Sequence, residues 1–441
     1  MIKYFKYLCL VAYILCFANS IYASSVPNIN AEAAILIDAK TGTVLYAKNA
    51  NEKYYPASIT KLMTALLTIE NLSPTDTVTF SKEAVYSLDK ESSNIGMDIG
   101  EVITVDQALH GLLLWSANDV ANGLAETIGG SIENFCKMMN QRAQDIGAVN
   151  TNFVNPHGFH DVNHYTTAYD MALIMREIYN NEYFLEIMSH PTYRIPATNV
   201  SDEIIYLSQQ HSLMNSIRDS QMFRSDVIGG KTGYTSQAGN TLVTASRQGN
   251  IDLITVILKG NRLNYYDDTN KLLNYGFSSF TSLNLSTPKD ILTILPLYSI
   301  HSGKLYEVAT CEISVKEPLN AIVSSNIKKQ DLDLNMTLPK HINFGKNIGD
   351  IVGEVNYTYK GKRLASCELM ISDIKFLPAP SPYVFPKDTS NVDAFTYIYP
   401  TVVCISVSLF LILMLRLRRK KYFFDDKNKL KFHKKVQKTL K

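Results

Sequence analysis

The stretch Tyr-Pro-Ala-Ser-Ile-Thr-Lys-Leu-Met-Thr-Ala-Leu-Leu, residues 55–67, carries the pattern that decides the fold. Its apolar residues recur at helical spacing from Ile59 onward, which predicts a helix over 58–70. Residues i and i+3 share one face of a helix, so Ser58 and Lys61 are expected within reach of each other. A serine hydroxyl needs an adjacent base to become a nucleophile, and a buried, neutral lysine can be that base. The same Ser-x-x-Lys pattern also arises where a serine is the N-cap of a helix and the lysine lies on the surface.

The sequence around this stretch places strands at both ends of a mainly helical region. Residues 33–46 predict a hairpin with a turn at Gly42, and residues 240–258 predict a second hairpin, followed by a helix at 268–275. Strands that open and close a region filled with helices indicate an α/β domain whose sheet joins its N- and C-terminal strands. Between the hairpins, helices are expected at 58–70, 106–113, 117–128, 132–146 and 167–180.

Two more short motifs follow in the chain. Ser116-Ala117-Asn118 comes directly after an apolar segment, so that a hydroxyl and an amide can point into one cleft, although a helix N-cap has the same composition. Lys231-Thr232-Gly233 follows two glycines and precedes the second hairpin. A cation, a hydroxyl and a glycine on a strand at a cleft edge suit an extended peptide that ends in a carboxylate. Taken alone, a basic turn explains this motif equally well.

Together the three motifs, in this order and with gaps of 58 and 115 residues between their first residues, resemble the active-site serine penicillin-binding and β-lactamase superfamily. Within it, the chain resembles the low-molecular-mass D-alanyl-D-alanine carboxypeptidases over about residues 30–280. This resemblance implies an α/β, β-lactamase/transpeptidase-like catalytic domain at 30–282, with an antiparallel sheet and helices. The segments that carry it are 37–42, 55–61, 116–119, 155–159, 166–170 and 230–239.

The resemblance implies three catalytic residues. Ser58 would attack the carbonyl between the two terminal D-alanines of a peptidoglycan stem pentapeptide, and Lys61 would take its proton. Ser116 would relay a proton to the leaving D-alanine, and water would release the shortened peptide from the acyl-enzyme. β-Lactams imitate the D-Ala-D-Ala end and should therefore acylate Ser58. No cofactor and no metal ion are implied.

The resemblance also implies a set of binding residues. Asn118 would hold the substrate amide and Lys61, while Lys231 and Thr232 would bind the terminal carboxylate. The backbone N–H groups of Ser58 and Tyr234 would form an oxyanion hole, which typically contributes about 3 kcal/mol per donor. The substrate-binding residues expected from the motifs are thus Asn118, Lys231, Thr232, Gly233 and Tyr234.

The sequence departs from the family pattern in two places. The family often has an arginine just before the helix that ends this domain, but Arg262 is the nearest one here and Tyr265 stands at roughly the expected position. An Asn-rich stretch often precedes the third motif, and here residues 208–211 read Ser-Gln-Gln-His. Both departures bear on recognition of the stem peptide and leave the three motifs unchanged.

Other functions fit parts of the sequence. A class A β-lactamase or an endopeptidase would share the motifs, and a β-lactamase also needs a glutamate between the second and third motifs, for which Glu177 has the best spacing. A zinc peptidase could use the cluster of His157, His160, Asp161 and His164, although clustered histidines more often bond locally. A non-catalytic cell-wall binding protein would be expected to lack a catalytic residue, and none is missing.

The remainder of the chain predicts export and anchoring. Residues 1–23 have the charged start and apolar run of a signal peptide, and residues 394–415 form an uncharged span long enough for a transmembrane helix. A basic tail at 416–441 follows and should stay cytoplasmic, which leaves the catalytic body on the extracytoplasmic side of the cell membrane as a single-pass protein. Between them we expect a small all-β domain at 286–376 and a Pro-rich stalk at 377–393.

Charge and cysteine content exclude some classes. The net charge is only +2 although the tail is strongly basic, so the body is mildly acidic and does not suit nucleic acid. Three cysteines fall in the exported body, which is no disulfide framework. Cys311 and Cys367 could pair, and the sequence leaves this open.

Overall fold

The computed structural model describes residues 26–88 and 92–378. Residues 55–67 contain a 3₁₀ helix, η1 (Ala57–Thr60), that leads into α2 (Lys61–Asn71). The expected helix at 58–70 therefore starts later as an α-helix, and Ser58 lies in the tighter turn before it. Ala57 has a φ of 52°, in the left-handed region. A non-glycine residue there is strained, so the surrounding structure must hold this turn in place.

A five-stranded antiparallel sheet forms the centre of the first part of the chain, in the order β2-β1-β9-β8-β7. Both predicted hairpins are confirmed, and the sheet joins N- and C-terminal strands as expected. All six residues of β1 are buried, because helices cover both faces of the sheet. The strands are β1 (Ala33–Asp38), β2 (Val44–Lys48), β7 (Val227–Thr235), β8 (Gly239–Gln248) and β9 (Ile251–Gly260).

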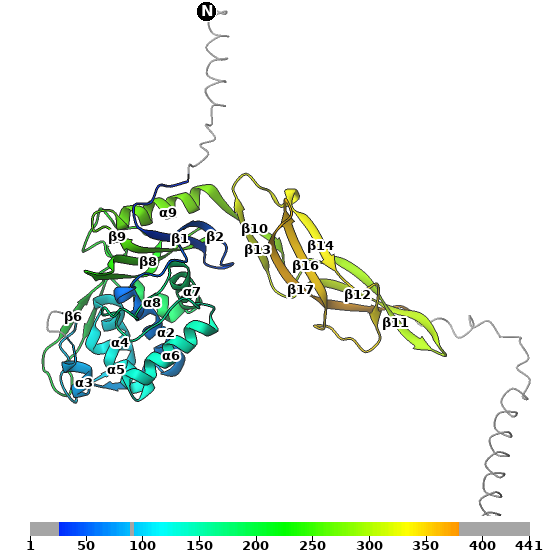
Figure 1. Cartoon of the computed structure of the whole chain (residues 1–441). Coiled ribbons are helices and arrows are strands. Elements are labelled where there is room, and N and C mark those ends of the chain that lie inside the picture. The colour runs from blue at the N-terminus through cyan, green and yellow to red at the C-terminus, as the bar shows by residue number, and fades with distance from the viewer. Residues whose placement is uncertain (1–25, 89–91, 379–441) are drawn as a thin grey trace, which may run out of the picture. The chain divides into compact units, whose positions relative to one another are not determined.

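Helices lie on the two faces of this sheet. Figure 1 shows α9 (Tyr265–Ser279) along one face and the other helices gathered on the opposite face, where α7 (Ala168–Tyr179) packs against β1, β8 and β9. The expected helices are found within a few residues, but two short ones were not predicted. The helices besides α2, α7 and α9 are α3 (Lys82–Tyr86), α4 (Val105–His110), a π-helical turn η2 (Gly111–Trp115), α5 (Asn118–Gly129), α6 (Ile132–Asp145), α8 (Glu182–Ser189) and a 3₁₀ turn η3 (Ser212–Met214).

Two small two-stranded sheets complete this part of the chain. β3 (Thr77–Thr79) pairs with β4 (Val102–Thr104), and β5 (Thr192–Ile195) pairs with β6 (Ile205–Ser208). None of these strands was predicted from the sequence, since three or four residues are too few to show a period. β6 leads directly into the segment that the sequence analysis singled out before the third motif.

The later part of the chain is all β, as expected, with its own buried apolar cluster that includes Leu297, Ile313 and Leu369. Cys311 and Cys367 lie on neighbouring strands but are both free thiols, which answers the question left open by the sequence. The strands are β10 (Phe280–Ser286), β11 (Thr293–His301), β12 (Lys304–Val315), β13 (Leu319–Ser324), β14 (Asp333–Thr337), β15 (Ile342–Asn343), β16 (Ile351–Tyr359) and β17 (Lys362–Phe376), with a 3₁₀ turn η4 (Lys329–Asp331).

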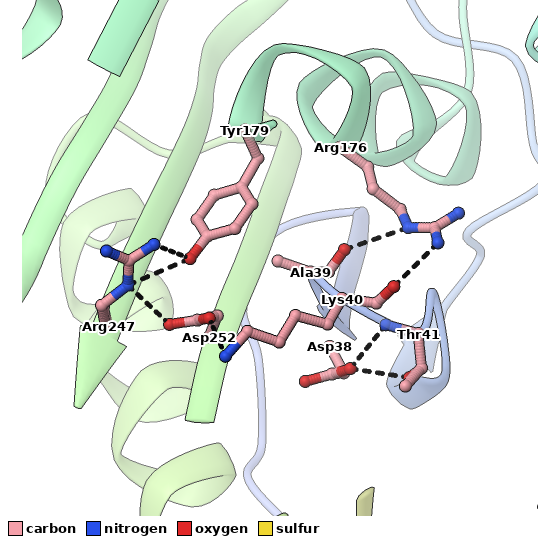
Figure 2. A network of polar contacts seen from close by, with 8 residues as sticks. All are labelled: Asp38, Ala39, Lys40, Thr41, Arg176, Tyr179, Arg247 and Asp252. Atoms are coloured by element: carbon pink, nitrogen blue, oxygen red, sulfur yellow. Dashed lines mark hydrogen bonds and ion pairs between the residues drawn. The ribbon is translucent and has the colours of Figure 1, made fainter. Parts of the chain in front are cut away.

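A polar network joins α7 to one end of the central sheet (Figure 2). The buried carboxylate of Asp252 on β9 is bound by Lys40 Nζ at 2.7 Å and by Arg247 Nε at 2.9 Å. Arg247 also donates to the Tyr179 hydroxyl at the end of α7. On the next turn, Arg176 Nε donates to the Ala39 carbonyl at 3.0 Å. This network therefore joins the β1–β2 turn, the β8–β9 hairpin and α7.

The predicted signal peptide, most of the Pro-rich stalk, the predicted transmembrane segment and the basic tail lie outside the described residues. Within residues 26–88 and 92–378, no helix is long and apolar enough to cross a membrane. The anchoring of the chain therefore remains a prediction from its sequence.

Candidate active site

An open cleft of about 1010 Å³ brings the three motifs together. Ser58 comes from η1, Ser116 and Asn118 come from the junction of η2 and α5, and Thr232, Gly233 and Tyr234 come from β7. Lys61 and Lys231 are almost completely buried behind the cleft surface. All eight predicted site residues thus lie in or directly beneath one cavity, although they are up to 176 residues apart in sequence.

The amino group of Lys61 is held by three oxygen atoms. Nζ lies 3.2 Å from Ser58 Oγ, 2.6 Å from Asn118 Oδ1 and 2.7 Å from the carbonyl oxygen of His157. Two of these oxygens can only accept hydrogen bonds. A neutral amine has two N–H groups and one lone pair, so two donated bonds leave the lone pair for the hydroxyl of Ser58.

Burial favours this neutral form. It lowers the pKa of Lys61 well below its usual value, the charge of Lys231 lowers it further, and the carboxylate of Asp119 opposes both. Asp119 is itself occupied, because it accepts hydrogen bonds from the backbone N–H groups of Ile95, Gly96, Met97 and Val120. It therefore fixes the loop over the second motif and leaves Lys61 without a direct carboxylate partner.

The second motif begins with a strained residue. Ser116 has φ 68° and ψ 32° and ends the π-helical turn, while Ala117 is the N-cap residue of α5. The simpler interpretation of this motif as a side-chain N-cap is therefore wrong. A left-handed serine that is held between two helices is a feature typical of functional sites, where surrounding contacts offset the strain.

The third motif places β7 against the turn that holds Ser58. A methyl group at Gly233 would lie 2.8 Å from the backbone nitrogen of Ser58 and 2.4 Å from Thr241 Oγ1. Only glycine allows the strand to come this close, and the same approach brings the Ser58 N–H group to the strand. Thr241 adds a hydrogen bond of 2.8 Å to the Pro56 carbonyl, which fixes the turn from the sheet side.

The loop at 155–159 supports the same turn from the other side. Gly158 has a φ of 87°, and a methyl group there would lie 1.8 Å from the Ala57 carbonyl oxygen. Nearby, His164 Nδ1 accepts the N–H of Val154 at 3.1 Å, so its Nε2–H donates to Thr60 Oγ1 at 2.8 Å. Burial lowers the pKa of His164 to about 3, which keeps the ring neutral. These supporting roles of Gly158 and His164 have no signal in the sequence.

The residues proposed for rival functions have other partners. Glu177, the candidate β-lactamase glutamate, is paired with Arg142 at 2.8 Å and does not line the cleft. In the histidine cluster, His157 Nδ1 accepts the N–H of Phe159 at 3.1 Å, and His164 is used as described above. Among the residues that the structure describes, no group of three or more His, Cys, Asp and Glu side chains could hold a metal ion.

The cleft is lined by one arginine that the sequence did not indicate. Arg262 does not line the cleft, whereas Arg218 does, beside Gln210 and Tyr265. Arg218 lies in the turn between η3 and β7, a segment without periodicity or a motif. No signal in the sequence alone could have placed it in this cleft.

Comparison with known proteins decides the family. A sequence model of D-alanyl-D-alanine carboxypeptidases matches residues 20–262. The chain belongs to the D-alanyl-D-alanine carboxypeptidase family. The carboxypeptidase DacF of Bacillus subtilis is 30% identical over 332 residues, which cover 73% of this chain and 81% of that protein. The carboxypeptidase DacA of Haemophilus influenzae is 30% identical over 364 residues, which cover 78% and 85%.

Solved structures agree with this D-alanyl-D-alanine carboxypeptidase assignment. Penicillin binding protein 5 of Haemophilus influenzae superimposes with a TM-score of 0.67 and 28% identity, covering 80% of this chain and 99% of that one. A peptidoglycan synthesis regulatory factor of Streptococcus pneumoniae has a TM-score of 0.65 and 25% identity, with 79% and 100% coverage. The predicted α/β transpeptidase-like fold with a separate β domain is thus confirmed.

Proposed function

We propose that this member of the family is a serine D-alanyl-D-alanine carboxypeptidase. It removes the terminal D-alanine from peptidoglycan stem pentapeptides through an acyl-enzyme on Ser58. One observation carries this proposal above all. The buried amine of Lys61 lies 3.2 Å from Ser58 Oγ, and its other two close partners are acceptors only. A neutral amine in that position is a general base for the serine hydroxyl.

Acylation begins when Lys61 Nζ accepts the proton of Ser58 and Oγ bonds to the carbonyl carbon between the two D-alanines. Negative charge then develops on the carbonyl oxygen. The backbone N–H groups of Ser58 and Tyr234 are proposed to bind it, a role supported by the close approach of Gly233 to Ser58. Donors that are fixed before the reaction stabilise such charge without reorganisation.

The acyl-enzyme forms when the carbon–nitrogen bond breaks. Ser116 is proposed to relay the proton from Lys61 to the leaving nitrogen, so that D-alanine departs as a neutral amine with its carboxylate. Asn118 would hold the substrate amide while it accepts a hydrogen bond from Lys61. Water then attacks the ester on Ser58, passes its proton to the base, and releases the shortened peptide and the serine hydroxyl.

Lys231 is proposed to bind the terminal carboxylate together with Thr232, and this predicts a pH effect. Burial lowers the pKa of Lys231 to about 7, so the ammonium loses its proton as the pH rises through that value. We expect the KM for a peptide with a free terminal carboxylate to rise by up to about tenfold between pH 7 and pH 9. Lys231→Arg stays charged throughout and should remove most of this rise, whereas an unchanged rise in that variant would assign it to another group.

The activity is tested by incubating the full-length chain with a stem pentapeptide that ends in D-Ala-D-Ala. A matched peptide that ends in D-Ala-L-Ala serves as the control, and free alanine is measured with and without benzylpenicillin. We expect release from the first peptide only, and inhibition by the β-lactam. Release that resists benzylpenicillin and stops with a chelator would support a zinc peptidase instead. Labelling by benzylpenicillin without release would favour an endopeptidase or β-lactamase, and neither signal would favour a non-catalytic binder.

We also propose that the catalytic body lies outside the cell and is anchored by residues 394–415. The charged start of residues 1–23, the uncharged span and the basic residues behind it support this orientation. A stem peptide in the cell wall is reached only from that side of the membrane. Protease added to intact protoplasts should therefore remove the body and spare the tail.

A further inference from the structure

The β11–β12 hairpin extends beyond the apolar core of the β domain (Figure 1). Leu297 and Ala309 lie opposite each other in the two strands, and both are buried. The side chains that follow toward the turn, at 298–300 and 304–308, are half-buried or exposed. A strand rises about 3.4 Å per residue, so the stretch from Ala309 to Lys304 is about 17 Å long. The core therefore does not cover the outer end of this hairpin.

The turn at the end of the hairpin sets the register of its two strands. Ser302 and Gly303 have φ values of 51° and 77°, both in the left-handed region. Two consecutive residues of this kind are typical of the type I′ turn, whose twist matches that of paired strands. Next to the turn, Ile300 of β11 is paired with Leu305 of β12. The turn therefore fixes which side chains lie opposite one another at this end.

Large apolar side chains are exposed at the outer end of the hairpin. Ile300 and Leu305 are 72% and 56% exposed, and because they are directly opposite each other they project from the same face. Tyr306, the next residue after Leu305, is 48% exposed. Phe344 is 67% exposed and lies beside β11, since its backbone N–H donates to the Tyr298 carbonyl at 2.8 Å. We call Ile300, Leu305, Tyr306 and Phe344 the apolar tip.

The composition of the apolar tip suits a membrane interface. Single exposed apolar side chains are common on proteins, whereas a group of large ones marks a surface that binds something. Aliphatic and aromatic side chains are the ones that proteins place at the boundary between headgroups and acyl chains. Lys304, which is exposed beside the turn, can lay its stem along apolar surface and keep its ammonium among the headgroups. The tip thus has an apolar part and a neighbouring cation.

The course of the chain favours a bilayer as the surface that covers the tip. The Ser372 hydroxyl of β17 donates to the Glu312 carbonyl of β12 at 3.1 Å, so β17 runs along the strand that leads to the tip. β17 ends at Phe376, and the proposed anchor begins at residue 394. The residues between them span at most about 60 Å when fully extended. An anchor on so short a linker keeps the tip at high local concentration near the bilayer, where a weak contact is enough.

We propose that the apolar tip inserts into the interface of the bilayer that holds the anchor. The tip gives the body a second attachment through the β domain and restricts its rotation about the linker. This inference rests on the proposed anchoring by residues 394–415 and is independent of the chemistry at Ser58. A second copy of the chain is the alternative partner that could cover the same residues.

A tryptophan placed in the apolar tip tests for this contact. The full-length chain is reconstituted in phospholipid vesicles whose acyl chains are either ordinary or brominated, since bromine quenches tryptophan fluorescence on contact. Ile300→Trp places the probe in the tip. Tyr206→Trp is the matched control, because Tyr206 is 70% exposed on β6, outside the β domain. The wild type, with Trp115 alone, gives the background, and thermal unfolding checks the fold of each variant.

We expect the fluorescence added by Ile300→Trp to fall about two- to fivefold in brominated vesicles, and that added by Tyr206→Trp to change by less than about 10%. Adding Leu305→Asp to Ile300→Trp should remove most of the quenching, because a carboxylate is disfavoured among acyl chains. Equal quenching of both probes, or of neither, would overturn the inference. A blue-shifted emission of Ile300→Trp without quenching would also overturn it and assign the tip to a second copy. Release of the wild type from vesicles by an alkaline wash would instead contradict the anchoring on which the inference rests.

Discussion

Ser58→Ala is expected to abolish both D-alanine release and covalent labelling by a fluorescent penicillin. Without Oγ no ester can form, and no other hydroxyl lies within hydrogen-bonding distance of Lys61 Nζ among the described residues. We expect the rate to fall by at least about 10,000-fold, since a nucleophile and its base act as one unit. Release is measured on the stem pentapeptide, and labelling on a gel of the full-length chain.

Ser236→Ala is the matched control for this experiment. Ser236 also lines the cleft, but its hydroxyl donates to Gln237 Oε1 and lies on the strand side of the site. It should therefore keep wild-type release and labelling. Release that survives in Ser58→Ala would contradict the serine mechanism and return attention to the histidine cluster, with a chelator as the next reagent.

Prediction from the sequence works best where the spacing of apolar residues shows which face of a helix or strand is buried. The hairpins at β1–β2 and β8–β9 and the main helices follow from apolar spacing, because one face of each element packs on the same core. The four short strands β3 to β6 could not be predicted from apolar spacing. They contain three or four residues each, and their pairing depends on partners 10 to 27 residues away.

The motif side chains were found by residue type and order, but their arrangement was not. The proximity of Ser58 and Lys61 follows from helical spacing and is seen at 3.2 Å, even though Ser58 lies in a 3₁₀ turn. The contact of Lys61 with the His157 carbonyl spans 96 residues and has no sequence signal, since any residue carries that oxygen.

Backbone packing explains much of what the sequence analysis missed. The turn at Ala57 contacts a loop on one side and a strand on the other. Gly158 and Gly233 lie at these two contacts, where a side chain would not fit. A single sequence shows that both residues are glycines, but it does not show that a side chain is excluded there. Likewise, Arg218 belongs to an aperiodic turn whose place in the cleft is set by the buried Asn215.

The second large effect is expected at Lys61. Lys61→Met keeps much of the apolar stem but has no lone pair to accept the Ser58 proton, so acylation by benzylpenicillin should slow about 1,000- to 10,000-fold. The Met variant also leaves Asn118 Oδ1 and the His157 carbonyl without their donor. A loss of acylation in Lys61→Met alone could therefore come from a distorted cleft and not from the missing base.

Lys61→Arg separates the two explanations. An arginine can still donate to both oxygens, but it stays protonated and cannot act as the base. If Lys61 is the base, the Arg variant should be as slow as the Met variant while both bind the free-carboxylate peptide with nearly wild-type affinity and unfold at similar temperatures. Recovery of acylation in Lys61→Arg would mean that residue 61 contributes hydrogen-bond donors to the cleft and does not act as a neutral amine base. The proton of Ser58 would then have to leave through another group, and Ser116, the hydroxyl of the second motif in the same cleft, would be the next candidate.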